Sequence, residues 1–203
     1  MNNKSFKTRV KDEAIKYAKD YKDIFVEKEY LIFSNSFNIQ PYYLLKAYKG
    51  NYLHLIGVHS TLNPEEFFDR CIDGTLTESD FDFTFQGENE QHVKGTVRRK
   101  IKAASHFKDF YTNIIGVEEK FQKGKIICKL AGSDGEITIG FTKNNISVPM
   151  TLLYGNELKN NMVTCDLILS KNINSKEYNN ILIGDENTLV SFINNNKEIV
   201  FKK

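Results

Sequence analysis

The sequence predicts an α+β protein, because helix-type and strand-type patterns concentrate in different parts of the chain. Spacings of three and four residues between apolar positions dominate several segments up to Tyr111. After Gly116, short apolar runs alternate with turns rich in glycine, asparagine and aspartate, which predicts a β-meander. The order lacks the regular strand, helix, strand alternation of a doubly wound sheet.

Length and composition limit which classes of protein this chain can belong to. The chain of 203 residues can bury a substantial core, and we expect a single domain over residues 1–203. With 28 Lys and Arg against 26 Asp and Glu, the formal charge is only +2, so any electropositive surface must be local. The three cysteines show no CxxC spacing, which predicts a reducing compartment. No window reaches the ~18 apolar residues of a membrane span, so we expect a cytoplasmic protein without a membrane partner.

The first elements follow from apolar spacing. Residues at about 5–21 predict an amphipathic helix, since Phe6, Val10, Ala14 and Tyr21 recur at helical steps. Runs rich in tyrosine, leucine and isoleucine then predict strands at Tyr30–Phe33 and Tyr42–Lys49.

The run Asn51-Tyr-Leu-His-Leu-Ile-Gly-Val58 places a histidine among apolar residues. Its composition predicts a strand, paired with Tyr42–Lys49 through a tight turn at Gly50-Asn51, with His54 in the middle of the strand. An imidazole titrates near neutral pH, so a histidine on a rigid element is a candidate general base or acid. A hydrogen-bonded core histidine is the structural alternative.

Two more helices and a series of strands complete the predicted order. Asn63 before Pro64, with two glutamates behind it, predicts a helix start, and Gly74 predicts its end. Helical spacing predicts the longest internal helix over Val93–Tyr111, which carries Arg98, Arg99, Lys100 and Lys102. The predicted strands that follow are Val117–Phe121, Lys125–Leu130, Glu136–Phe141, Val163–Leu169, Asn180–Ile183, Thr188–Ile193 and Glu198–Phe201.

Several common chemistries lack their motifs. The four histidines form no HExxH pattern and no zinc-type set with cysteine, so we predict neither a metal site nor a cofactor. No GxxxxGK[ST], GxGxxG or GxSxG occurs, which argues against phosphate loops and nucleophile elbows. The acidic run from Asp69 to Asp82 is typical of a solvated surface, with a two-metal nuclease as the alternative.

A set of short motifs resembles a known family. The motifs are the His54 segment, Phe67-Phe68-Asp-Arg-Cys71 with Gly74 and Leu76, Val148-Pro-Met-Thr-Leu-Leu153, Leu167-Ile-Leu-Ser-Lys171, and Tyr178. Together they resemble the phage-associated barnase-EndoU-colicin-RelE-like nuclease group, and in particular a branch marked by a strand that reads HLTG. The match spans about residues 30–183, and this chain has Ile56 where that branch has threonine.

The resemblance implies helices packed on a twisted antiparallel sheet, as in a barnase/RelE-like core, and a metal-independent ribonuclease encoded by a phage or mobile element. Carried over by motif, His54, Thr151 and Lys171 are the implied catalytic residues. His54 would deprotonate a ribose 2′-hydroxyl, Lys171 would offset charge on the phosphorane-like transition state, and Thr151 would position a phosphate oxygen. Arg98, Arg99, Lys100 and Tyr48 are the candidate contacts to RNA, by charge and by stacking.

A second interpretation stays open at this point. The near-neutral charge also suits a catalytically silent member of the same fold that binds and blocks a host defence protein or nucleic-acid complex. The two interpretations differ in whether His54, Thr151 and Lys171 converge in one cleft. Oligomeric state and RNA sequence preference are beyond what the sequence indicates.

Overall fold

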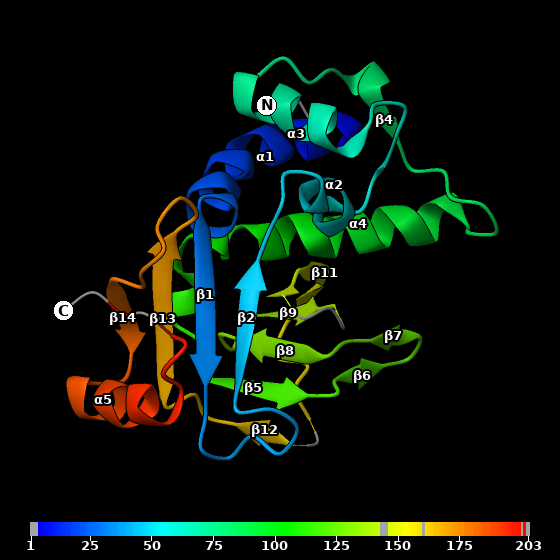
Figure 1. The fold of residues 1–203 in the computed structure, drawn as a ribbon. Helices are drawn as coiled ribbons and strands as arrows, with labels where there is room; N and C mark the ends of the chain where they lie inside the picture. The colour runs from blue at the N-terminus through cyan, green and yellow to red at the C-terminus, as the bar shows by residue number, and fades with distance from the viewer. Residues whose placement is uncertain (1–3, 143–145, 160, 200, 202–203) are drawn as a thin grey trace.

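Figure 1 shows the fold in a computed structural model, which describes residues 4–142, 146–159, 161–199 and 201. It is α+β, as predicted. The helices α1, α2 and α3 gather above α4, and the strands lie below and beside them. Their bounds are Phe6–Tyr21 for α1, Asn51–Ile56 for α2, Pro64–Asp73 for α3, Glu90–Ala104 for α4 and Glu186–Asn195 for α5. None of the described helices is long and apolar enough to cross a membrane.

Among the described residues, most strands form two larger sheets. The first has the order β10-β2-β1-β13-β14, with β10 (Ile146–Ser147), β2 (Tyr42–Lys46), β1 (Lys28–Phe33), β13 (Leu167–Asn172) and β14 (Asn180–Ile183). Its neighbours are antiparallel except for the parallel pair of β10 and β2. The sheet therefore joins strands from both ends of the chain.

The second sheet has the order β11-β9-β8-β5-β12 and is antiparallel throughout. It comprises β11 (Pro149–Tyr154), β9 (Ile137–Phe141), β8 (Leu130–Ser133), β5 (Gly116–Glu119) and β12 (Met162–Val163). Two small strand pairs are separate from both sheets: β3 (His59–Ser60) with β4 (Phe81–Asp82), and β6 (Gln122–Lys123) with β7 (Ile126–Ile127). The β6–β7 hairpin projects away from the second sheet (Figure 1).

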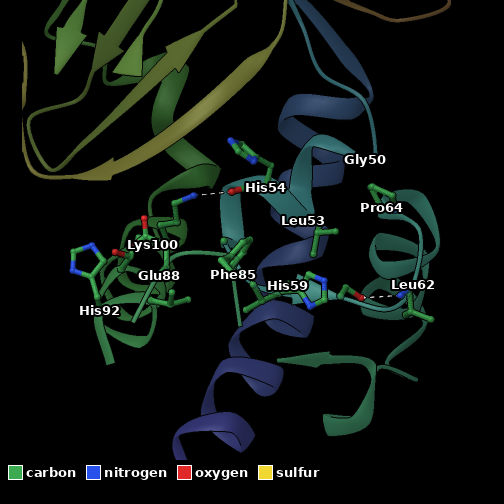
Figure 2. Close-up of a pocket in the computed structure, with 15 residues that line it drawn as sticks. Gly50, Leu53, His54, His59, Leu62, Pro64, Phe85, Glu88, His92 and Lys100 are labelled. Carbon is green, nitrogen blue, oxygen red and sulfur yellow. Dashed lines mark hydrogen bonds between the residues drawn. The ribbon is translucent and has the colours of Figure 1, made fainter. Parts of the chain in front are cut away.

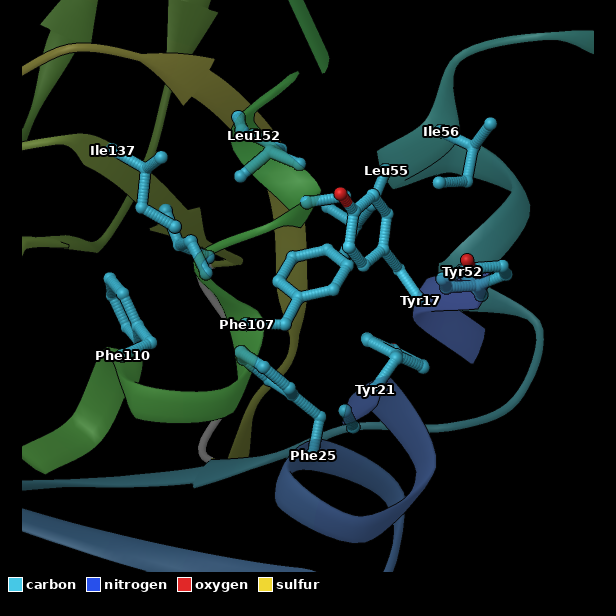
Figure 3. Packing of buried hydrophobic residues seen from close by; sticks show 14 of the residues in the cluster. Tyr17, Tyr21, Phe25, Tyr52, Leu55, Ile56, Phe107, Phe110, Ile137 and Leu152 are labelled. Atoms are coloured by element: carbon cyan, nitrogen blue, oxygen red, sulfur yellow. The ribbon is translucent and has the colours of Figure 1, made fainter. Parts of the chain in front are cut away.

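The main core is aromatic and lies where α1, α2 and the second sheet meet (Figure 3). Tyr21 is its centre, with ring centroids 5.2 Å from Phe25, 5.0 Å from Tyr52 and 5.6 Å from Phe107. Stacked and tilted aromatic pairs at such distances add to the free energy of burial. The core therefore fixes α2, and with it the His54 segment, against α1.

The structure corrects the prediction for the His54 segment, which forms helix α2 and not a strand. Tyr52, Leu55 and Ile56 are the fully buried side chains, and their spacing of three and four residues is helical. Gly50 is the N-cap of α2, so Gly50-Asn51 is no hairpin turn. A short apolar run of this kind fits both periods, and packing against α1 and α3 decided between them.

Other predicted elements changed in type or extent. The helix predicted over Val93–Tyr111 is α4 followed by a separate 3₁₀ helix at Phe107–Thr112. The strand predicted at Thr188–Ile193 is part of helix α5, whose N-cap Asp185 accepts a hydrogen bond from the Thr188 amide at 2.8 Å. Of the strand predicted at Glu198–Phe201, Phe201 forms one isolated bridge with Tyr178, and residue 200 lies outside the described residues.

The two faces of the first sheet pack against different clusters. Tyr30 and Ile32 on β1 belong to the main core, whereas Leu31 lies in a second cluster with Leu189 and Phe192 of α5. Because side chains alternate along a strand, Glu29 shares the α5 side with Leu31. This division decides where the residues of β13 point.

Candidate functional site

A pocket of about 660 Å³ lies between α2, α4 and β3 (Figure 2). It is lined by both apolar and titratable side chains, a combination that is typical of ligand and catalytic sites. Three of the chain's four histidines line it, together with a lysine and a glutamate: His54, His59, His92, Lys100 and Glu88. This pocket is the candidate active site.

His54 stands at the edge of the pocket, on the exposed side of α2, and its imidazole points toward β11 (Figure 2). The surrounding protein atoms lower the pKa of His54, and the positive charge of Lys100 lowers it further. A backbone hydrogen bond with Met150 opposes both effects. His54 is therefore neutral at pH 7 and can accept a proton.

Lys100 lies half-buried across the end of α2. Its Nζ donates a hydrogen bond of 2.7 Å to the carbonyl oxygen of His54, in the last turn of the helix, where carbonyls lack intrahelical donors. Burial lowers the pKa of Lys100 to about 8. No carboxylate pairs with Lys100 among the residues that the structure describes, so its charge is available to a ligand.

Gly57 makes room for this lysine. It ends α2 with φ +80°, and a Cβ built there would lie 2.7 Å from Cδ of Lys100 and 3.1 Å from its Nζ. A side chain at this position would meet both a strained backbone and the lysine stem. In His54-Leu-Ile-Gly57, the histidine supplies a carbonyl to Lys100 and the glycine supplies the space.

Helix α4 contributes a row of polar side chains to the same pocket. His92, Thr96 and Lys100 all line it, and their spacing of four residues places them along one side of the helix. Figure 2 shows Lys100 extending toward the His54 carbonyl, with His92 farther along the same helix. The helix thus offers a hydroxyl and an imidazole beside the lysine charge.

His59 is held by a carboxylate. β3 and β4 place it directly opposite Asp82, and its Nδ1 lies 3.1 Å from Oδ1 of Asp82. The same oxygen accepts hydrogen bonds from the backbone nitrogen and the hydroxyl of Thr84, at 2.8 and 2.5 Å. Nδ1 is thus engaged by Asp82, and among the described residues no hydrogen bond involves Nε2, the nitrogen that transfers the proton in a histidine oriented by an aspartate.

The structure does not bring Thr151 or Lys171 to this pocket. Thr151 is buried in β11 opposite Gly140, on the side of the second sheet that carries Cys128. Lys171 lies on β13 opposite Glu29, on the α5 side of the first sheet, and its Nζ is 3.0 Å from Glu29 Oε2. His54, Thr151 and Lys171 therefore do not converge in one cleft, which is the outcome that counts against an enzyme site made of these three residues. Their individual roles stay predictions.

The predicted RNA contacts are also dispersed. Of the α4 cations, Lys100 enters the pocket, Arg98 lies over the ring of Phe6, and Arg99 donates a hydrogen bond to Thr96 at 3.2 Å. Tyr48 is exposed before α2, beside Lys46. Consecutive residues point around a helix, so one basic run serves several surfaces.

Sequence reasoning missed His59, His92, Thr96 and Glu88. A signal for part of this set was present, because His92, Thr96 and Lys100 repeat every fourth residue, although the predicted helix began only at Val93 and left His92 just outside it. No local signal joins them to His54, which is 38 residues from His92. Within the described ranges, no group of three or more His, Cys, Asp or Glu side chains is arranged to hold a metal ion.

Comparison with known proteins gives one family. Residues 15–203 match the family described as phage-Barnase-EndoU-ColicinE5/D-RelE like nuclease 4. The match supports a phage-type nuclease and fits the α+β, barnase/RelE-like fold predicted from the sequence. Neither the curated proteins nor the solved structures gave a match. Because the family match covers nearly the whole chain, this protein belongs to the phage-Barnase-EndoU-ColicinE5/D-RelE like nuclease 4 family.

Proposed function

We propose that the protein is an endoribonuclease that cleaves RNA without a metal ion, in the pocket between α2 and α4. The observation that carries the proposal is the Lys100 ammonium, held without a counter-charge among the described residues, beside His54 in a pocket with two further imidazoles. A perturbed lysine next to proton-transfer groups in a concave site is a typical arrangement for catalysis.

His54 is the proposed general base. Its lowered pKa keeps the imidazole neutral at pH 7, so it can take the proton of a ribose 2′-hydroxyl. The 2′-oxygen then attacks the adjacent phosphorus and forms a 2′,3′-cyclic phosphate. The reaction needs the 2′-hydroxyl, so RNA is cleaved and DNA is not.

His59 is the proposed general acid. The bond from phosphorus to the 5′-oxygen breaks, and that oxygen takes a proton from Nε2 of His59. Asp82, at 3.1 Å from Nδ1, orients the imidazole for this transfer. Exchange of protons with water returns both histidines to their starting states.

Lys100 is the proposed charge stabiliser. The transition state carries extra negative charge on the phosphate oxygens, and a fixed cation in a partly desolvated site stabilises it more than water does. A pKa of about 8 leaves most Lys100 side chains protonated at pH 7. The role that the resemblance gave to Lys171 thus passes to a lysine that lines the pocket.

The test is cleavage of a mixed pool of structured and single-stranded RNA in EDTA, with DNA of the same sequences alongside. We expect wild-type protein to cleave only the RNA, with cyclic-phosphate ends. His54→Ala is expected to lower the rate by about 10²–10⁴-fold. The matched control is His106→Ala, since His106 lies 3.7 Å from Asp134 and does not line the pocket.

Three results would contradict the proposal: cleavage of DNA, loss of activity with chelator, or equal losses in the two histidine variants. Folded wild-type protein that cleaves no RNA would instead favour the alternative function, a silent family member that binds a host defence protein or nucleic-acid complex.

A further inference from the structure

We propose that the groove between α1 and α4 is a second RNA contact, which binds the phosphate backbone of a single strand outside the cleavage pocket. This α1–α4 groove has a volume of about 450 Å³. The inference rests on the proposed function in that it takes RNA as the substrate, but it concerns affinity and not bond cleavage.

The groove holds its cations on aromatic rings. The guanidinium carbons of Arg9 and Arg98 lie 5.9 and 5.2 Å from the centroid of the Phe6 ring. Farther along α4, Nζ of Lys102 lies 4.2 Å from the ring centroid of Tyr154 on β11, which does not itself line the groove. Such contacts hold long side chains in place before a ligand arrives, which lowers the entropy lost on binding.

These three cations lack counter-ions within the described part of the chain. The carboxylates that line the groove are Asp12 and Glu13. Asp12 is paired with Lys4 at 2.7 Å and Glu13 with Lys16 at 3.7 Å, whereas no ion pair between described residues involves Arg9, Arg98 or Lys102. The groove therefore presents a net positive charge to solvent although the whole chain is nearly neutral.

The groove and the cleavage pocket use different sides of α4. Arg98 and Lys102 each follow a pocket residue, Thr96 and Lys100, by two positions, which is about 200° around a helix. Substitutions in the groove can therefore change RNA affinity without contacting the pocket. An RNA strand that reaches both sites must cross α4.

The chemistry favours single-stranded RNA as the occupant. A positively charged groove that is also lined by aromatic side chains, here Phe6 and Tyr17, is typical of proteins that bind single strands without sequence preference. Arginine suits phosphate because its planar fork can donate two hydrogen bonds to one phosphate group. An acidic protein is the competing occupant, and competition between RNA and an acidic polypeptide distinguishes the two.

The probe is a fluorescein-labelled 12-nucleotide RNA with 2′-O-methyl riboses, which no 2′-hydroxyl attack can cleave. Fluorescence anisotropy between 50 and 200 mM salt gives the dissociation constant and its salt dependence. We expect Arg9→Gln with Arg98→Gln to weaken binding at least tenfold, and to reduce the slope of log K against log salt by about 0.7 per lost phosphate contact. Lys19→Gln with Lys108→Gln removes the same charge from outside the groove and is the matched control.

Equal affinities for the two double variants would overturn the inference, and so would wild-type protein that does not bind the probe. Polyglutamate that competes as well as unlabelled RNA would overturn the RNA assignment in favour of an acidic protein. His54→Ala separates this inference from the proposed function, because it should lose cleavage while the difference in affinity between the two double variants persists in its background. If wild-type protein binds the probe but cleaves no RNA, only the proposed catalysis is contradicted.

Discussion

Lys100 and Lys171 are both partly buried, but their surroundings differ. Lys171 lies between a carboxylate and a ring, with Nζ 3.0 Å from Glu29 and 5.4 Å from the Tyr178 centroid, and Lys46 approaches the same carboxylate at 3.2 Å. Lys100 instead donates a hydrogen bond to a backbone carbonyl, and its side chain lies against Gly57, which has no side chain. Burial without a counter-ion from the described residues lowers its pKa to about 8.

Under the proposed function, the difference distinguishes a lysine that stabilises the fold from one that acts on the substrate. A partly buried cation that forms an ion pair with a carboxylate on the neighbouring strand contributes to packing and orientation. Its charge is already neutralised by that partner. A covered cation without a carboxylate costs stability, and such costs are concentrated where a ligand or transition state supplies the missing charge. The comparison therefore favours Lys100 over Lys171 as the residue that meets phosphate.

The largest expected effect tests this comparison directly. Lys100→Met should lower RNA cleavage by about 10²–10³-fold, because the transition state loses its only proposed fixed cation. Lys171→Met should leave the cleavage rate within about threefold and act on stability, since it leaves Glu29 with Lys46 alone. Single-turnover rates with excess enzyme measure both. A greater loss of cleavage in Lys171→Met than in Lys100→Met would support the original prediction that Lys171 stabilises the transition state, and would contradict the role proposed for Lys100.

A smaller effect concerns the pH dependence of cleavage. The proposed reaction needs neutral His54 and charged Lys100, so the rate should rise through the lowered pKa of His54 and fall as Lys100 deprotonates near pH 8. Between pH 7 and pH 9 we expect about a tenfold fall. A uridine 3′-phosphodiester with a 4-nitrophenyl leaving group measures this fall in rate by itself, because such a leaving group needs no general acid. A rate that stays flat to pH 9.5 would remove Lys100 from the reaction.

The smallest expected effect uses two glycines that end helices in the left-handed region. Gly57 at φ +80° faces Lys100, whereas at Gly74, with φ +71°, an added Cβ would have no neighbouring atom within 4 Å. Gly74→Ala should lower the free energy of unfolding by about 1 kcal/mol, through backbone strain alone. Gly57→Ala should lower it by about 2 kcal/mol, because the methyl group also displaces the lysine. Urea unfolding measures both, and equal losses would show that the Lys100 contact is not tight.

Much of the fold was predictable where a local pattern was sufficient. The helix at about 5–21 is α1 at Phe6–Tyr21, capped by Ser5, and the helix after Asn63 ends at Gly74, because caps and apolar spacing are properties of a few neighbouring residues. β14 has the predicted bounds Asn180–Ile183. Local patterns were insufficient for the His54 run and for Thr188–Ile193, which are helical in the structure.

The sequence by itself determined the α+β class, the family resemblance and the candidacy of His54 and Lys100, because these depend on residue identity and short spacing. Only the tertiary structure decided which polar side chains share a pocket. The packing of α2 against α4 brings the Lys100 ammonium to the His54 carbonyl, 46 residues away, and strand pairing sets Asp82 against His59. The same strand alternation turns Lys171 to the α5 side of the first sheet. Side-chain direction and long-range contact depend on how elements pack, which no local pattern encodes.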